Sequence, residues 1–421
     1  MNVPVLGRAR FPSPLKRWVN ESERVPATIV RTVDARPEEG VLFELAGARE
    51  HLFFHPPETR AGVVTCGGLC PGLNDVIRSL FFEMHDAYGV PELLGFRWGY
   101  QGLDPEQGAE PLVLTHQIVD RIHLQAGTIL GTSRGPVDKT RAVENLIRRR
   151  INILFTIGGD GTQRGAREFF LEAQRRGYPL SVVGIPKTID NDIPFVARSF
   201  GFLTAVEEAT KVLQRAHTEA RSVQNGISLV KLMGRHAGFL TAEATVASQE
   251  VNFALVPEVP FRLEGESGFL SALEQRITTR GHAVIALAEG AGQDLLGNTG
   301  SERDASGNIR LSDIGLFLRE KIEQWFKARN IPVVFRYFDP SYIVRSSPDN
   351  AEDAVLCDVF ARHAAHAAMA GKSGVVIGFL HDRFIHVPIE LLTSQKQKRL
   401  DPDSPAWSAV LSATGQPHHF E

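Results

Sequence analysis

The sequence predicts an α/β fold with two Rossmann-like lobes, each built on a parallel-rich sheet with helices on both faces. Three observations carry this prediction. At 421 residues the chain is longer than one hydrophobic core usually fills. Apolar runs of strand length recur, and several end in glycine-rich loops that open amphipathic helices. This alternation of strand, loop and helix is typical of parallel sheets.

The first sixty residues are polar and irregular, with proline punctuation in HPPETR, and predict an N-terminal extension. The repeating pattern begins with the strand AGVVTC (61–66), the loop GGLCPGLN and the helix DVIRSLFFEMHDAYG. It recurs in the strand INILFTI (151–157), the loop GGDGTQRGA and a helix through REFFLEAQRRG, and the strand PLSVVGI follows. Ligands of such sheets bind beyond the carboxyl ends of the strands, where these loops lie.

A second α/β unit is predicted between about residues 200 and 340. The runs NGISLVKLMG (225–234) and GHAVIALAEG (281–290) are further strands that end on glycine with a charged residue adjacent. The polar stretch NTGSERDASGNIR (298–310) predicts a solvent-exposed insertion. The last residues, HHFE (418–421), predict a solvated tail.

Composition argues against several classes of protein. Hydrophobic residues make up 43% and charged residues 23% of the chain, which is ordinary for a globular protein. The net charge of −3 and the lack of a long basic stretch argue against a nucleic-acid partner. No apolar run has the length of a membrane span, and the N-terminal sequence lacks the apolar region of a secretion signal. Three cysteines do not make a disulfide framework, so the expected compartment is the cytoplasm.

The loop GGDGT (158–162) has the composition of a phosphate site. Glycines let backbone N–H groups approach a phosphate, and the N-terminus of the following helix adds partial positive charge. Asp160 does not suit a phosphate contact, because both groups are anionic. It suits Mg²⁺, which takes one or two carboxylates and keeps several waters. A structural turn is the alternative for this motif taken alone.

The segment PKTIDND (186–192) sets two carboxylates and a lysine beside a strand end. In an extended segment Thr188, Asp190 and Asp192 project to the same side. A carboxylate there could take a proton from a sugar hydroxyl, and a second acid nearby would raise its basicity. A helix N-cap or a pair of Asx turns is the alternative. Beside a magnesium-type loop, catalysis is favoured.

Taken together, the motifs resemble the 6-phosphofructokinase family over nearly all of residues 61–390. The motifs are GGDGT, PKTIDND, KLMGR (231–235) and AEGAGQ (288–293), in that order and spacing. The stretches CGGLCPGLNDVIR, GFRWGYQGL, NGISLVKLMGRHAGF and DPSYIVR are similar to its plant-type ATP-dependent branch, which is kin to the pyrophosphate-dependent enzymes.

This resemblance implies the phosphofructokinase fold, with the active site in the cleft between the two lobes. It implies a homo-oligomer, dimer or tetramer, that transfers a phosphoryl group from Mg-ATP to the 1-hydroxyl of fructose 6-phosphate in glycolysis. The expected domains are an extension (1–60), a nucleotide-binding lobe (61–200 plus about 344–395), a sugar-phosphate-binding lobe (201–343) and a C-terminal tail (396–421).

The resemblance also implies residue roles. Asp190 would be the base, with Thr188 and Arg134 also catalytic, and Asp160 would hold Mg²⁺. The nucleotide phosphates would be lined by Gly68, Arg134, Gly159, Asp160, Gly161, Thr162 and Gly165. The sugar would be lined by Thr188, Ile189, Asp190, Asp192, Met233, Gly234, Arg235 and Glu289. The 6-phosphate would be bound by Arg336, Tyr342 and Arg345.

The phosphoryl donor is the open point of the resemblance. Glycine after the GGD acid leaves room for the α-phosphate of ATP, and this chain has Gly161. Lysine before TIDND is found in pyrophosphate users, and this chain has Lys187. The plant-type branch combines both and uses ATP, so ATP is favoured and pyrophosphate is the alternative. A non-catalytic regulatory subunit would be expected to lack the base or the metal acid, and both are present.

Two positions depart from the simpler bacterial members of the family. Gly226 stands where they have an arginine that crosses a subunit interface, and Phe82 replaces one of two effector-site arginines, the other being Arg78. Their tetramer geometry and their regulation by ADP are therefore not expected here.

Overall fold

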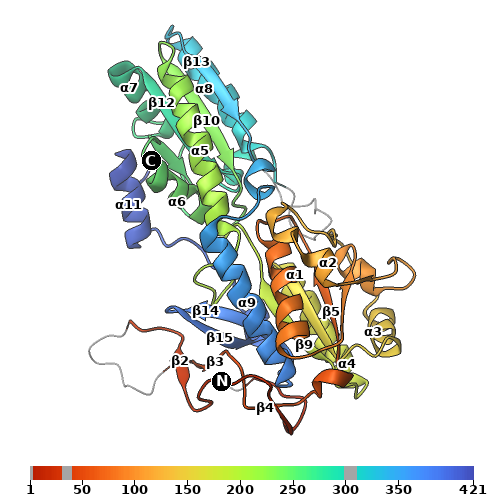
Figure 1. Ribbon diagram of the computed structural model, residues 1–421. Coiled ribbons are helices and arrows are strands. Elements are labelled where there is room, and N and C mark those ends of the chain that lie inside the picture. The colour runs from red at the N-terminus through yellow and green to blue at the C-terminus, as the bar shows by residue number, and fades with distance from the viewer. Residues whose placement is uncertain (1–2, 31–39, 298–310) are drawn as a thin grey trace. The chain divides into compact units, whose positions relative to one another are not determined.

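The computed structural model describes residues 3–30, 40–297 and 311–421 (Figure 1). The predicted insertion at 298–310 lies outside the described residues. The chain divides into two compact units. Unit 1 consists of Met1–Thr188, Ile193–Gly201 and Ser346–Lys396, and unit 2 consists of Ile189–Asp192, Phe202–Arg345 and Gln397–Glu421.

Unit 1 contains a nine-stranded mixed sheet. Its strands lie in the order β2 (Arg24–Pro26), β3 (Leu42–Leu45), β15 (Arg383–Pro388), β14 (Val375–Leu380), β9 (Ser181–Pro186), β8 (Ile153–Gly158), β5 (Arg60–Thr65), β6 (Glu92–Phe96) and β7 (Leu112–Val113). The strands from β14 to β6 are parallel, and the others pair antiparallel at the two ends. From the adjacent strands β5 and β8 the chain crosses in opposite directions, to β6 and to β9. The loops after β5 and β8 therefore lie at the topological switch point, where ligands of open α/β sheets bind.

Helices of unit 1 cover both faces of this sheet, because right-handed crossovers in opposite directions place helices on opposite faces. Helix α1 packs beside α9 on one face (Figure 1), and α3, α4 and α10 pack together on the other. Their bounds are α1 (Leu73–Phe82), α2 (His116–Val119), α3 (Lys139–Arg148), α4 (Asp160–Arg175), α9 (Ala351–Met369) and α10 (Ile389–Ser394). A π-helical turn, η2 (Glu83–Ala87), extends α1.

The N-terminal residues add strands to unit 1. Strand β3 pairs with β15, and β2 pairs with β3, so they complete one edge of the large sheet. Short strands β1 (Phe11–Pro12) and β4 (His51–Leu52) pair separately. A buried ion pair joins this segment to the core, with Lys372 Nζ 2.7 Å from Glu44 Oε2, and Phe43 is fully buried. The sequence predicts an irregular extension for residues 1–60. These strands escape that prediction because they are short and because β3 pairs with β15, which is distant in the sequence.

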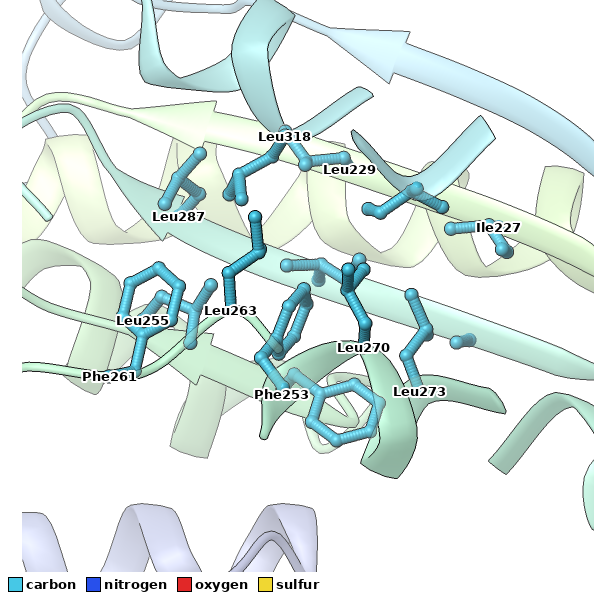
Figure 2. Packing of buried hydrophobic residues seen from close by; sticks show 14 of the residues in the cluster. Ile227, Leu229, Phe253, Leu255, Phe261, Leu263, Leu270, Leu273, Leu287 and Leu318 are labelled. Atoms are coloured by element: carbon cyan, nitrogen blue, oxygen red, sulfur yellow. The ribbon is translucent and has the colours of Figure 1, made fainter. Parts of the chain in front are cut away.

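Unit 2 contains a four-stranded parallel sheet. The order is β11 (Phe253–Leu255), β12 (His282–Ala288), β10 (Gly226–Leu232) and β13 (Val334–Phe338). One face is covered by α5 (Phe202–Arg221) and α6 (Phe239–Ser248), and the other by α7 (Phe269–Arg280) and α8 (Ile314–Ala328). Figure 2 shows the core on the second face, where strand residues such as Leu229 and Leu255 pack against Leu270 and Leu318.

Gly226, at the start of β10, has no room for a side chain. A Cβ there would lie 2.1 Å from the carbonyl oxygen of Ala220. The position that carries an arginine in simpler family members is thus restricted to glycine by packing in this chain.

The C-terminal segment is packed on unit 2. Helix α11 (Pro405–Thr414) lies against α6, and Trp407 is fully buried. Arg262 N–H donates to Phe420 O at 2.9 Å, and the Phe420 ring packs among the core rings of Phe253 and Phe269. The predicted solvated tail is therefore wrong for Phe420, although His418 and His419 are exposed. Of the helices in the described ranges, none has both the length and the apolar character needed to span a bilayer.

Three histidines of unit 1, the buried His386 and the half-buried His363 and His366, contribute to its sensitivity to acid. Burial lowers the pKa of His363 to about 3, and those of His366 and His386 to about 4. Below the ordinary pKa of about 6.5 the unfolded chain takes up protons that the folded chain does not, until the pH nears 4. The contribution of these histidines to stability is therefore expected to fall between pH 6.5 and 4, by up to about 1.4 kcal/mol per pH unit for each histidine.

Replacement of His363 by Phe should reduce this slope, because it removes one of the three titrating rings. The site should accept phenylalanine, since the His363 ring already stacks on Phe384 with centroids 4.6 Å apart. The measurement is the urea midpoint of unfolding across that pH range, with exposed His418→Phe as the control. An unchanged slope in His363→Phe would contradict the assignment.

Candidate active site

The GGDGT loop joins β8 to α4, and its glycines differ in their surroundings. A Cβ at Gly158 would lie 2.1 Å from Thr162 Oγ1, and one at Gly165 would lie 2.5 Å from the Tyr100 ring. Gly159 caps α4, its carbonyl accepting the N–H of Thr162 at 2.9 Å. At Gly161 a Cβ would meet only Arg164 Nη2, at 3.9 Å. Packing thus fixes the turn, while the space around Gly161 is open.

Asp160 lies in the first turn of α4, where the helix dipole favours an anion. Its side chain is 17% exposed and forms an ion pair with Arg164 one turn later. A carboxylate in this place offers one ligand oxygen to a cation bound beyond the strand ends.

The loop after β5 and the segment GTSR (131–134) lie against each other. Gly67 N–H donates to Ser133 O at 3.2 Å, and Thr132 Oγ1 donates to Gly67 O at 2.6 Å. Arg134, next in the chain, is exposed. The structure therefore places the Gly68 loop and the Arg134 segment side by side at one end of the sheet.

Lys187 connects these segments. It is 5% exposed, its N–H donates to Gly158 O at 3.1 Å, and its ammonium donates to Gly68 O. Thr188 follows at the end of unit 1, with its carbonyl accepting from Ser199 Oγ at 2.7 Å. The lysine thus brings a positive charge to the loop after β5, the place where the anionic donor is expected.

Two side chains that support this arrangement were missed by the sequence analysis. Gln163 is fully buried, and its Nε2 donates to Gly158 O at 2.9 Å and Ile185 O at 3.3 Å. Tyr100 Oη donates to Thr162 O at 2.6 Å. Gln163 directly follows the glycine loop, and Tyr100 lies in the stretch GFRWGYQGL, which are the signals that could have indicated a role.

In unit 2, Asp190 lies among charged side chains. The pKa of the Asp190 carboxyl is raised to about 8, chiefly by burial. The carboxylates of Asp192 and Glu289 also raise this pKa. The guanidiniums of Arg235 and Arg345 lower it by less. The structure therefore brings together five of the predicted site residues. The extended segment predicted for PKTIDND is wrong at Asn191, whose φ of 53° is left-handed. Asparagine tolerates this conformation, which turns the chain between the two aspartates.

The loops after β10 and β12 fix Arg235 and Glu289. Glu289 N–H donates to Leu232 O at 2.9 Å, and Gly290 N–H donates to Gly234 O at 3.1 Å. Gly234 has a φ of 130°, and a Cβ there would lie 2.7 Å from Ala237 O, so only glycine fits. Burial raises the pKa of Glu289, against the influence of Arg235. Half-buried Met233 precedes this turn.

The three residues expected to bind the 6-phosphate do not lie together in unit 2, because Arg336 is apart from Tyr342 and Arg345. The Arg345 guanidinium lies over the Tyr342 ring, 4.9 Å from its centroid, and Tyr342 is 74% exposed. Arg336 is instead in the middle of β13, level with Ser228, and its Nε is 3.8 Å from Glu219 Oε2. Strand β10 continues from Ser228 to Leu232, where its loop begins. At about 3.3 Å per residue, Arg336 is therefore about 13 Å from that end of the sheet.

The C-terminal segment holds Asp192, a contact that the sequence did not predict. Gln397 Nε2 donates to Asp192 Oδ2 at 3.0 Å, and Lys398 N–H donates to Asp192 O at 2.8 Å. Burial lowers the pKa of the Lys398 ammonium to about 8, although Asp192 and Glu243 raise it.

Glycine loops and charged side chains thus lie at the strand ends of both units. The pattern of the phosphofructokinase family matches residues 60–368, and the chain belongs to this family. It is similar to the ATP-dependent 6-phosphofructokinase of Borreliella burgdorferi, with 46% identity over 95% of this chain and 91% of that one. It is also similar to ATP-dependent 6-phosphofructokinase 7 of Arabidopsis thaliana, with 44% identity over 95% and 82%.

The fold matches a solved structure as well. A pyrophosphate-dependent phosphofructokinase from Marinobacter aquaeolei aligns with a TM-score of 0.69 and 20% identity, covering 85% of this chain and 91% of that chain. The predicted α/β fold and family are thereby confirmed.

Alanine at Gly158 and at Gly161 should have opposite effects on stability. Gly158→Ala forces a methyl group into Thr162 and should lower the melting temperature. Gly161→Ala adds a methyl in open space on the first turn of α4, where alanine is the better helix former, and should keep or raise it. Thermal unfolding by circular dichroism measures both. Equal destabilisation by the two would contradict the packing described for this loop.

Proposed function

We propose that this protein transfers the γ-phosphoryl group of ATP to the 1-hydroxyl of fructose 6-phosphate. The products are fructose 1,6-bisphosphate and ADP. The observation that carries the proposal is the placement of Asp190, a carboxyl with a raised pKa among Asp192, Glu289, Arg235 and Arg345. The relatives at 46% and 44% identity are ATP-dependent 6-phosphofructokinases, which supports the same reaction.

Asp190 is the general base of the proposed reaction. Its Oδ accepts the proton of the 1-hydroxyl while the bond from that oxygen to the γ-phosphorus forms and the bond from the γ-phosphorus to the bridging oxygen of ADP breaks. The pKa of about 8 makes this carboxylate a stronger base than an ordinary aspartate. Arg235 and Arg345 neutralise the negative charge that the sugar phosphate adds beside the three carboxyls of this cluster.

The donor phosphates are bound by unit 1. Backbone N–H groups at the start of α4, with Arg134 and Lys187, face the charge of the polyphosphate, and phosphoryl transfer depends chiefly on such positioning and neutralisation. Asp160 fits Mg²⁺, because this ion takes few protein carboxylates and completes its shell with phosphate and water. When bound, Mg²⁺ neutralises the transferring phosphates. Lys187 and Thr188 belong to unit 1 and Ile189–Asp192 to unit 2, so one short segment carries both the donor-side lysine and the base.

The proposal includes a homo-oligomer, and Arg336 supports it. This residue stands away from the strand-end cluster of its own unit, with a side chain 45% exposed. We propose that it contacts the 6-phosphate bound by a neighbouring copy of the chain.

A coupled assay tests the function. Purified protein with fructose 6-phosphate, Mg²⁺ and ATP should form fructose 1,6-bisphosphate, and Asp190→Asn should lower kcat by at least about 10²-fold. The acid limb of the wild-type kcat/KM profile should lie near pH 8 and be absent from the residual activity of the variant. Exposed Asp382→Asn is the matched control. Absence of product, or full activity in Asp190→Asn, would refute the proposal.

Aspartate at position 161 tests the choice of donor. The open space at Gly161 accommodates a side chain, so Gly161→Asp should fold but repel the α-phosphate of ATP. We expect kcat/KM for ATP to fall at least about tenfold, with pyrophosphate affected less. Gly161→Ala, which adds bulk without charge, should keep most of the activity with ATP. Wild-type activity with pyrophosphate alone would reverse the donor assignment.

A further inference from the structure

Three potential metal ligands converge on the surface of unit 1, apart from the site described above. His85 and Asp86 lie in the π-helical turn η2, and His116 is the first residue of α2. His85 Nδ1 is 2.7 Å from Asp86 Oδ1, and His116 Nε2 is 3.0 Å from Asp86 Oδ1 and 3.1 Å from Oδ2. One ligand atom from each residue lies within 4.8 Å of the others, and no other group of this kind occurs within residues 3–30, 40–297 and 311–421.

These distances suit a tetrahedral metal ion after small side-chain rotations. Bonds of about 2.0–2.2 Å to nitrogen and oxygen place tetrahedral ligand atoms about 3.3–3.5 Å apart. The three side chains are 40%, 44% and 56% exposed, so they can rotate and the ion can enter. Two imidazoles and one carboxylate leave the fourth position for water.

The aromatic rings around the cluster keep the imidazoles near their observed orientations, which leaves room for the small rotations. The Phe81 ring stacks on His85 at 5.0 Å and 15°, and it meets the His116 ring edge-on at 5.0 Å and 87°. The Phe82 ring packs against His116 at 5.7 Å. Ligands that neighbouring groups orient before binding lose less freedom on coordination.

The ligand chemistry favours a transition metal, and the tetrahedral arrangement favours Zn²⁺ among them. Imidazole nitrogens suit zinc, copper and nickel, whereas Mg²⁺ prefers an all-oxygen shell. The three cysteines, which could compete for a soft ion, are buried. We propose that His85, Asp86 and His116 form a Zn²⁺ site on unit 1 that ties the end of α1 to α2.

Bound Zn²⁺ links two segments that are distant in the chain. Helix α1 begins directly after the loop that carries Gly68, and its other end carries the site. Because the ion binds the folded arrangement and not the unfolded chain, it stabilises unit 1 in proportion to its occupancy.

Zinc binding to the full-length protein, freed of metal with a chelator, tests the proposal. Isothermal titration with ZnCl₂ alone should show one site, and Zn²⁺ should raise the melting temperature. His116→Ala should weaken binding at least about tenfold and remove the thermal shift, and Asp86→Asn should do the same while keeping hydrogen bonds to the histidines. Excess MgCl₂ should not compete.

The matched control is the double substitution of His418 and His419 by Ala, which removes two adjacent exposed histidines with rings 5.1 Å apart. It should bind zinc as the wild type does. The proposal is overturned if zinc does not bind, if His116→Ala binds it with unchanged affinity, or if only the control variant loses it.

Discussion

A single buried amide sets the geometry on which unit 1 depends. Gln163 Nε2 donates to the carbonyl oxygens of Gly158 and Ile185, the ends of two adjacent parallel strands. Gly184 leaves room for this amide, since a Cβ there would lie 2.1 Å from Gln163 Oε1 and would displace it. Strand β8 leads into GGDGT and β9 into PKTIDND, so this amide bridges the two paired strands that carry the motifs. A buried amide is a strong constraint because leaving its partners unpaired costs about 1–3 kcal/mol.

Burial and neighbouring carboxylates make the cluster around Asp190 in unit 2 costly to build. The carboxyls of Asp190 and Glu289 both have raised pKa values, which means that folding disfavours their ionised forms. Arg235 and Arg345 offset part of this cost, and an anionic sugar phosphate would in turn be favoured by those arginines. Electrostatic strain at such a site is typical of catalytic groups whose pKa is adjusted to a proton-transfer step.

The sequence predicted the central strands and the site motifs because both are local. Glycine loops after apolar runs were enough to place β5, β8, β9, β10 and β12, and the motif residues lie where those strands end. Long-range features escaped prediction. Nothing near Glu44 indicates that it pairs with Lys372, and nothing near Asp192 indicates that Gln397 binds it. The prediction of an extended segment failed at Asn191, whose backbone is left-handed. The alternation of residue types along PKTIDND cannot reveal a single residue in that conformation.

The edge formed by β2 and β3 has a consequence for the order of events during synthesis. Glu44 and Lys372 are separated by 328 positions, and β15, the partner of β3, follows still later. At about 5–20 residues per second, the ribosome needs roughly 20 to 70 s to produce that partner. Until then β2 and β3 form at most an isolated hairpin, which is marginal in water. Strands β2 and β3 thus leave the ribosome long before their partner strand is made, and chaperones have that interval in which to bind them.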